Sequence, residues 1–278
     1  MPSEMRVFQI YYDAATRASL DPDLEPLDNS ANERPDWFEY WPMRSYFLRQ
    51  PLLQTAYYGF LSPLFFSKTH LTGRQVKEFI TQADGADVVT FSPHPCHGAC
   101  FYNVFEQGEN CHAGFLDVAR RFIRELDPSV RLEAVVNHSR NTVFCNYFAA
   151  RPSFWSHWRR AFDALFRHAE DRASPLYAAL NRPVEYTKDD GEAKPAQMKV
   201  FVMERMASLL LALGSFATRN YPPFRLPLSA PFVGRLSEIV ALDALKIAYA
   251  DTGNAEFLRV YVEARDKLAA AAWFGKPA

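Results

Sequence analysis

Three features are scarce in this chain: cysteine, net charge and long apolar runs. Only four cysteines occur among 278 residues, and the N-terminus has no signal-peptide pattern, so we expect free thiols in a cytoplasmic protein rather than disulfides. The net charge of -1 argues against a nucleic-acid partner. The longest apolar stretch, around 206–217, is shorter than the ~20 residues of a transmembrane helix, which leaves only peripheral membrane contact open.

Aromatic side chains are plentiful, at 15% of the chain, and they gather within 37–73. After a helix predicted over 38–48, this region leads to the sequence YYGFLSP at 57–63. Aromatic rings interrupted by glycine and proline favour a shaped loop that presents rings and backbone amides to a ligand. The candidate ligand contacts in this loop are Tyr58, Gly59 and Ser62.

The order of the apolar segments predicts an α/β fold. Strands are predicted at 6–12, 86–91, 132–136 and 142–149, and helices at 73–80, 115–126, 153–166 and 198–216. This alternation favours a mostly parallel sheet flanked by helices. Two amphipathic helices at about 235–250 and 254–271 predict a C-terminal helical layer. We therefore divide the chain into an α/β domain over 1–218 and a helical extension over 219–278 packed on it.

Polar residues follow the predicted strands, where ligands bind in open α/β sheets. Asp13 and the preceding Tyr12 end the first strand. The carboxylate of Asp13 can bind a ribose hydroxyl or a base edge of a nucleoside, or it can simply cap a helix or form a turn. The segment 101–114 is predicted as a polar loop that binds a sugar or phosphate, or that merely caps the next helix. Asn146, predicted inside a strand, either contacts a ligand or pins a neighbouring loop. The candidates in the polar loop are Asn103, Gln107 and His112.

An acid and a base stand side by side in the most apolar predicted helix, at 198–216. Glu204 and Arg205 can be buried there only if they are paired or face a cleft. The alternatives are a structural ion pair with another segment and a functional role, in which Glu204 faces a cleft as a base or a hydroxyl ligand and Arg205 faces a phosphate. Because consecutive helix residues point about 100° apart, one side chain can face a cleft while the other pairs structurally.

Histidine and cysteine side chains suggest a metal site, but their spacing does not match the common ones. The residues concerned are His94, Cys96, His97, Cys100, Cys111 and His112. The spacing lacks the paired knuckles of a zinc finger, so no metal ligand is assigned, and a metal-dependent hydrolase built on this group is kept as an alternative. A D-x-D pattern occurs at 21–23, in the long first loop rather than in the usual place.

Six segments carry a resemblance to a known group of proteins. They are YYDAATRASLDPDLEPLDN, EYWPMRSYF, YYGFLSPLFFSKT, NVFEQGENCHAGF, VFCNYFAARPSFW and FVMERMASLLLAL, and together they span most of 7–213. In these segments the chain resembles a group of bacterial proteins that are encoded with polysaccharide-biosynthesis enzymes and described as glycosyltransferase-like. The resemblance implies a GT-A fold and the transfer of a sugar from a nucleoside-diphosphate donor to a glycan or lipid-linked acceptor in cell-surface polysaccharide synthesis.

The same resemblance implicates particular residues. They are Asp13, Ser62, Lys68, Asn103, Gln107, His112, Asn146, Glu204 and Arg205. We expect Glu204 to be the catalytic base or a hydroxyl ligand, with His112 as the second catalytic candidate. Lys68 or Arg205 can neutralise the leaving diphosphate. No cofactor is assigned, and a Mg or Mn ion is left open because the usual D-x-D is missing.

Two questions stay open at this point. The alternative to an enzyme is a non-catalytic binding or scaffold protein of the same fold that recruits polysaccharide enzymes. The sequence does not fix the oligomeric state, and an oligomer is compatible with it.

Overall fold

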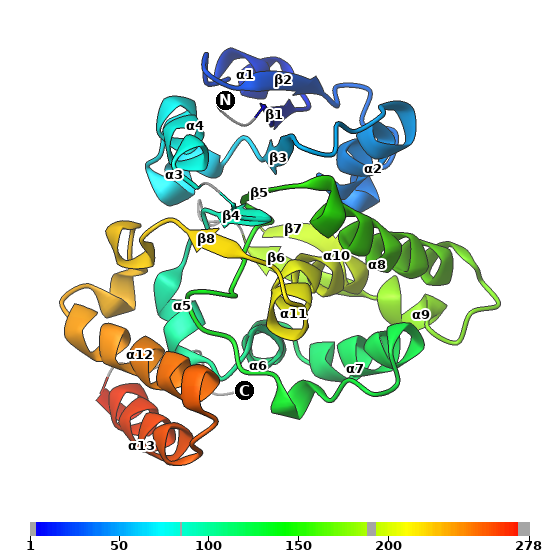
Figure 1. Cartoon of the computed structure of the whole chain (residues 1–278). Helices are drawn as coiled ribbons and strands as arrows, with labels where there is room; N and C mark the ends of the chain where they lie inside the picture. Colours follow the sequence, from blue (N-terminus) through cyan, green and yellow to red (C-terminus); the bar gives the residue numbers. More distant parts are fainter. Residues whose placement is uncertain (1–3, 84, 188–192, 272–278) are drawn as a thin grey trace.

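The protein is built around a central six-stranded β-sheet (Figure 1). In the computed structural model, which describes residues 4–83, 85–187 and 193–271, the strand order is β2-β1-β3-β5-β4-β8. The strands are β1 Met5–Tyr11, β2 Glu25–Asp28, β3 Tyr57–Leu61, β4 Val88–Thr90, β5 Phe148–Ala150 and β8 Thr218–Asn220. Neighbouring strands are parallel except where β5 meets β3 and β4. The predicted α/β class with a mostly parallel sheet flanked by helices is confirmed.

Helices surround this sheet (Figure 1). They are α1 Ala14–Ala18, α2 Tyr40–Arg49, α3 Phe65–Thr69, α4 Gly73–Thr81, α5 Pro95–Cys100, α6 Val104–Cys111, α7 Phe115–Leu126, α8 Pro152–Glu170, α9 Tyr177–Leu180, α10 Met198–Glu204, α11 Met206–Leu213, α12 Leu236–Thr252 and α13 Glu256–Ala271, with 3-10 turns at Pro35–Trp37, Leu132–Ala134, Pro223–Arg225 and Ala230–Phe232. A separate antiparallel pair consists of β6 (Pro183–Thr187) and β7 (Ala193–Gln197). In the described part of the chain, no helix is long and apolar enough to cross a membrane.

The central strands are buried on both faces, as expected for a sheet between two helical layers. In β3, Tyr58 and Phe60 face one core, which α2, α8, α10 and α11 complete. Tyr57 and Leu61 face a second core, which α3 and α4 complete. The indole of Trp155 on α8 donates a hydrogen bond to the Tyr58 carbonyl at 2.9 Å, so the first helical layer is bonded directly to the sheet.

The prediction of a ligand-presenting loop at 57–63 is wrong, because its first five residues form β3. All five are buried. Gly59 serves the packing of neighbouring strands, since a Cβ there would lie 3.2 Å from both the Ala149 Cβ and the Phe148 carbonyl oxygen. The aromatic rings therefore fill the core, and the segment reaches the edge of the sheet only at Ser62.

Two predictions around α6 are also wrong, for a shared reason. The segment 101–114 is not a loop, because Asn103 accepts hydrogen bonds at 2.9 Å from two amides of the first turn of α6 and so begins a helix. The same side chain donates to the carbonyls of Leu132 and Val135 at 3.0 and 2.8 Å. These bonds satisfy the backbone of 132–136, which forms a 3-10 turn instead of the predicted strand.

The strand predicted at 142–149 and the helix predicted at 198–216 are both shorter in the structure. The strand predicted at 142–149 shrinks to β5, because Cys145 and Asn146 adopt left-handed backbone conformations. Asn146 therefore lies in a turn before β5 and not inside a strand. The helix predicted at 198–216 divides at Arg205 into α10 and α11.

The last two helices pack against each other, and α12 also packs against α5 (Figure 1). Tyr261 of α13 donates its hydroxyl hydrogen to the Cys100 carbonyl at 2.8 Å. The boundary predicted between 1–218 and 219–278 falls inside β8, a strand of the central sheet. The division into two domains stays a prediction.

Two buried side chains of α12 fasten this helix to the rest of the protein. Lys246 is 0% exposed and donates to the carbonyls of Gly98 and Phe101, at the end of α5, at 2.5 and 2.6 Å. Asp243 accepts hydrogen bonds from the amide and hydroxyl of Ser139 at 2.7 and 2.6 Å. Burial lowers the pKa of Lys246 to about 8, yet the ammonium ion still supplies the donors that end α5.

We expect Lys246→Met to destabilise the protein by about 2 kcal/mol, because two buried carbonyls lose a charged hydrogen-bond donor. Urea unfolding followed by circular dichroism measures this change. The control is Lys267→Met on the exposed face of α13, for which we expect less than about 0.5 kcal/mol. Equal stability of the two variants would contradict the role given to Lys246.

Candidate functional site

Polar side chains from separate segments meet at the edge of the sheet where the parallel strands end. The segment after β3 brings Lys68, on α3, and the turn before the antiparallel β5 brings Cys145 and Asn146. Glu204 and Arg205 come from the junction of α10 and α11. With Glu39, Tyr40, Gln107 and His112, these residues form what we call the central cluster.

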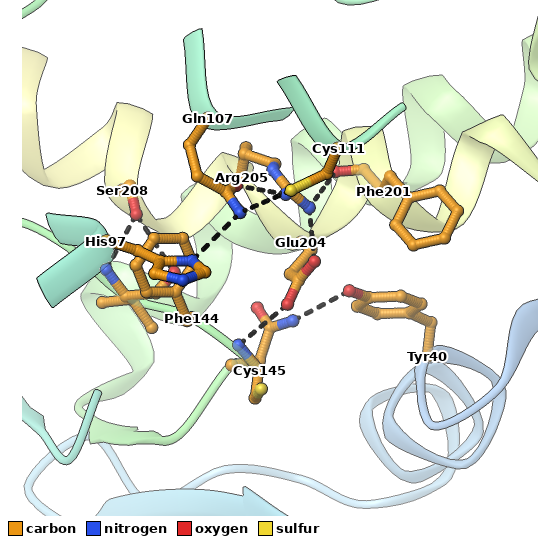
Figure 2. Close-up of polar contacts among 12 residues, drawn as sticks. Tyr40, His97, Gln107, Cys111, Phe144, Cys145, Phe201, Glu204, Arg205 and Ser208 are labelled. Carbon is orange, nitrogen blue, oxygen red and sulfur yellow. Dashed lines mark hydrogen bonds and ion pairs between the residues drawn. The ribbon is translucent and has the colours of Figure 1, made fainter. Parts of the chain in front are cut away.

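A buried ion pair between Glu204 and Arg205 organises the central cluster (Figure 2). The guanidinium of Arg205, 3% exposed, donates to the Glu204 carboxylate. It also donates to Gln107 Oε1 at 2.6 Å and to the Phe201 carbonyl at 3.3 Å. Glu204 in turn accepts from the Cys145 amide at 3.1 Å. These bonds tie α10, α6 and the turn before β5 to one point.

Glu204 keeps its negative charge in this environment. Burial raises the pKa of its carboxyl, but the Arg205 charge and the Cys145 amide outweigh burial and hold the pKa below its usual range. The side chain of Glu204 is 23% exposed, so the carboxylate remains reachable. An ionised carboxylate has lone pairs for further hydrogen bonds, and Glu204 can therefore accept them from hydroxyl groups of a ligand.

The turn that faces Glu204 is held in an unfavourable backbone conformation. Cys145 and Asn146 have φ of 58° and 53°, a region that non-glycine residues rarely occupy. The turn is fixed by its contacts: Asn146 Nδ2 donates to the Tyr40 hydroxyl at 2.9 Å, and Lys68 Nζ lies 3.4 Å from Cys145 Sγ. Such strain is concentrated at functional sites in known proteins.

Unpartnered polar atoms are concentrated in the central cluster. Among the described residues, five buried side-chain nitrogen or oxygen atoms have no hydrogen-bond partner, and three of them lie here: Arg205 Nε, Asn146 Oδ1 and His112 Nδ1. A buried polar atom left unpaired costs about 1–3 kcal/mol. Their gathering beside a strained turn indicates a place where a ligand supplies the missing bonds.

Two histidines beside the ion pair are neutral at physiological pH. Burial, reinforced by the charge of Arg205, lowers the pKa of His112 to about 4, and its ring lies against Phe201 with centroids 3.7 Å apart. Burial likewise lowers the pKa of His97 to about 4, and its Nδ1 lies 3.5 Å from Gln107 Nε2. Neutral imidazoles can exchange hydrogen bonds with a ligand but add no charge to the site.

Asp13 and Tyr12 lie on the same edge of the sheet as Ser62, because β1 and β3 are parallel neighbours. The Asp13 carboxylate accepts from the Thr16 amide at 2.7 Å and caps α1, while the Tyr12 amide donates to the Thr16 hydroxyl at 3.1 Å. In the strand order, β3 separates β1 from β5. Asp13 and Tyr12 therefore lie at the same edge of the sheet as the turn at Cys145, but one strand away from it. In the structure they form the helix cap that was predicted as the alternative.

Four other predicted contacts have packing or capping roles in the structure. Tyr58 and Gly59 are buried in β3, and Asn103 caps α6. The Ser62 hydroxyl shares a hydrogen bond of 2.5 Å with the Tyr147 hydroxyl. Of the predicted site residues, those that the structure brings together are Lys68, Gln107, His112, Asn146, Glu204 and Arg205.

The residues considered as metal ligands take part in packing and loop contacts. Within 4–83, 85–187 and 193–271, no three His, Cys, Asp or Glu side chains are placed to hold a metal ion. Cys96 and Cys100 belong to the core under α12 and α13. In the D-x-D pattern, Asp21 accepts from the amides of Gly73 and Asp23 at 2.7 and 2.8 Å, which fastens the first loop to α4.

Sequence reasoning missed Glu39, Tyr40 and Cys145 as members of the central cluster. For Glu39 and Tyr40 the sequence held a signal, because they are the first two residues of EYWPMRSYF, one of the six segments that carry the resemblance. The helix predicted over 38–48 explained the apolar spacing of that segment, so no site role was assigned to its first two residues. Cys145 carried no such signal, since its contribution is a backbone amide in an unpredicted turn.

A surface cavity of about 320 Å³ lies outside the central cluster, between the segment after β2 and α2. Its lining includes Trp41 and Arg49 and no member of the central cluster. The Trp41 ring already contacts the guanidinium groups of Arg34 and Arg44, with centroid distances of 5.6 and 5.9 Å. We therefore place the candidate site in the central cluster, where the unpartnered atoms are.

Comparisons of the chain with protein-family models, with curated proteins and with solved structures give no significant match.

We expect the stability of the protein to fall as the pH is lowered from about 6.5 to about 4, since an unfolded histidine takes up a proton in this window while His112, with a pKa of about 4 in the fold, does not. Urea unfolding at several pH values measures the slope. His112→Phe keeps the contact with Phe201 and removes the titration, so its slope should be shallower. A 1H–15N spectrum showing a protonated His112 ring at about pH 5.5 would contradict this assignment.

Proposed function

We propose that the protein is a GT-A-like glycosyltransferase that moves a sugar from a nucleoside-diphosphate donor to a glycan or lipid-linked acceptor in cell-surface polysaccharide synthesis, in the cytoplasm. The observation that carries the proposal is the gathering of three unpartnered buried atoms and an ionised, reachable carboxylate at the ligand-binding edge of an α/β sheet. The resemblance in six sequence segments points to the same reaction.

The chemistry of the central cluster suits a sugar with a charged leaving group. Hydroxyl groups of a sugar are hydrogen-bond donors, which match the Glu204 carboxylate and Asn146 Oδ1. The two cations, Arg205 and Lys68, can stabilise the negative charge that develops on a leaving diphosphate. The end of β1, at Tyr12 and Asp13, would hold the nucleoside.

The closeness of opposite charges explains why this arrangement can favour a transition state. Glycosyl transfer separates charge, with positive character on the sugar and negative charge on the departing phosphate. A fixed carboxylate at Glu204 stabilises the first and a fixed guanidinium at Arg205 the second, and neither has to reorganise because both are held by hydrogen bonds. This is the role that we give to the ion pair.

Binding of the donor's nucleotide is the first test. Isothermal titration with UDP, GDP, CMP and dTDP should detect one preferred nucleotide with a dissociation constant in the micromolar range, roughly -8 kcal/mol at 1 μM. Lys68→Met should weaken that binding, because it removes a cation from the proposed phosphate site. Absence of binding for all four nucleotides would contradict the proposed function.

Glu204→Gln should reduce sugar transfer by about 100-fold or more, because the amide is neutral and cannot stabilise positive charge on the sugar. The assay follows release of the nucleoside diphosphate from the donor that the wild type uses. Glu125→Gln, on the exposed face of α7, is the control and should keep full activity. A Glu204→Gln protein that retains wild-type transfer, or that restores the polysaccharide in a deletion strain, would instead favour a non-catalytic scaffold.

A further inference from the structure

The exposed face of α8 carries a surface cavity that no step of the proposed reaction uses. The cavity has a volume of about 360 Å³ and lies outside the central cluster. Its lining residues recur at intervals of three and four along α8, so they share one face of the helix. They are Ser156, Arg159, Arg160, Asp163 and Arg167, which we call the arginine stripe.

The positive charge of the arginine stripe is not neutralised by the protein. Within residues 4–83, 85–187 and 193–271, none of its three arginines has an ion-pair partner within 4 Å. The two acids of α8 are both bound elsewhere. Asp163 accepts from Arg44 at 3.3 Å, and Glu170 accepts from Arg34 at 2.6 Å. Since the whole chain has a net charge of only -1, the stripe is a local positive surface that attracts a negatively charged partner.

An exposed leucine borders the arginine stripe, because α2 packs along α8 (Figure 1). Near the middle of α2, Arg44 binds Asp163 at 3.3 Å. Three residues later, the centroid of the Phe47 ring lies 5.6 Å from the Arg159 guanidinium carbon. The two helices therefore run antiparallel. Leu48, the next residue of α2, lies toward the same end of the stripe as Arg159 and is 58% exposed.

A second exposed leucine lies in the segment between α2 and β3. Leu53 is 53% exposed. This segment is fastened to the start of α8, because Arg151 donates to the Thr55 carbonyl at 2.8 Å. Leu48 and Leu53 therefore place two apolar side chains in solvent near the beginning of α8, next to the arginine stripe.

We propose that the arginine stripe, Leu48 and Leu53 form the surface through which the protein binds a membrane that contains anionic phospholipids. Arginines near such a membrane are attracted to its negative surface, and leucine side chains that enter the interface bury apolar area. The stripe extends over about three helical turns and has leucines beside it. A soluble phosphate or a nucleic acid makes no use of the leucines, whereas a lipid surface uses both features.

The same two helices border the central cluster on their inner side. Tyr40, the first residue of α2, is hydrogen-bonded to Asn146 at 2.9 Å. Its ring also contacts Trp158 and Phe162 of α8, with centroids 6.2 and 6.1 Å away. A protein bound through the arginine stripe therefore holds the central cluster one helical layer away from the membrane, where a lipid-linked acceptor is found.

Co-sedimentation of the full chain with vesicles tests the proposal. The protein should pellet with phosphatidylcholine vesicles that contain about one third phosphatidylglycerol and should stay in solution with phosphatidylcholine alone, because only the first surface is negative. Raising the salt concentration from about 0.05 M to about 0.5 M should release it, since salt screens exposed charges. A wild type that does not pellet with the anionic vesicles at the lower salt would overturn the proposal.

Charge variants locate the surface. Arg160→Gln combined with Arg167→Gln should weaken vesicle binding by about 30-fold, because each arginine near the membrane contributes roughly a factor of five. The control combines Lys77→Gln on α4 with Lys267→Gln on α13, which removes the same net charge and should leave binding unchanged. Equal binding by the two double variants would overturn the assignment, provided that circular dichroism shows both to be folded.

A leucine variant separates a membrane from other anions. Leu53→Ser should weaken vesicle binding by about fivefold without changing its salt dependence, because it removes apolar contact and no charge. Leu236→Ser, at an exposed leucine of α12, is the control and should bind as the wild type does. If Leu53→Ser also binds as the wild type does, the membrane assignment is wrong.

Two competitors complete the test. Millimolar inorganic pyrophosphate should displace the protein from vesicles no more than sodium chloride of the same ionic strength does. Stronger displacement, or binding of duplex RNA as tight as that of the anionic vesicles, would overturn the membrane assignment.

Membrane binding and the proposed function fail in different experiments. A protein that binds one of the four nucleotides but no vesicle would leave the proposed function in place and remove the membrane surface. A protein that binds vesicles through the arginine stripe but none of the nucleotides would do the reverse.

Discussion

The buried guanidinium of Arg205 is the interaction on which the arrangement of the site depends. It lies where α10 gives way to α11, and it bonds Glu204, Gln107 and the Phe201 carbonyl. Burying an unpaired guanidinium is very costly. The fold is therefore stable only if α6 and α10 place hydrogen-bond acceptors next to this charge. Glu204, once fixed in this way, fixes the turn at Cys145 through that residue's amide.

The backbone of the site is held in unfavourable conformations, while several of its buried polar atoms lack hydrogen-bond partners. Left-handed residues, among them Phe38, Cys145 and Asn146, lie in or next to the central cluster, and each costs conformational energy that the surrounding packing must offset. A purely structural ion pair would gain nothing from this strain or from unpartnered buried atoms. A site that binds a polar ligand gains preorganisation from both, since the donors and acceptors are already in place when the ligand arrives.

Much of the fold could be predicted from the sequence, because the signals are local. The amphipathic spacing of Phe115–Leu126 predicted α7. The helix predicted at 73–80 is α4, which Thr72 caps by accepting a hydrogen bond from the Gln75 amide. In each case the residues that determine the outcome lie within one or two helical turns of each other, so neighbouring sequence carries the information.

The sequence by itself determined the α/β class, the main helices and the position of an acid and a base within an apolar helical segment. Only the tertiary structure decided that YYGFL is a strand covered on both faces and that Cys145 and Asn146 turn back toward Tyr40. It also decided that Glu204 and Arg205 pair with each other rather than with another segment. The physical reason is that burial of both faces of a strand, backbone strain and the pKa of a carboxyl depend on groups from distant segments, which meet only when the chain has folded.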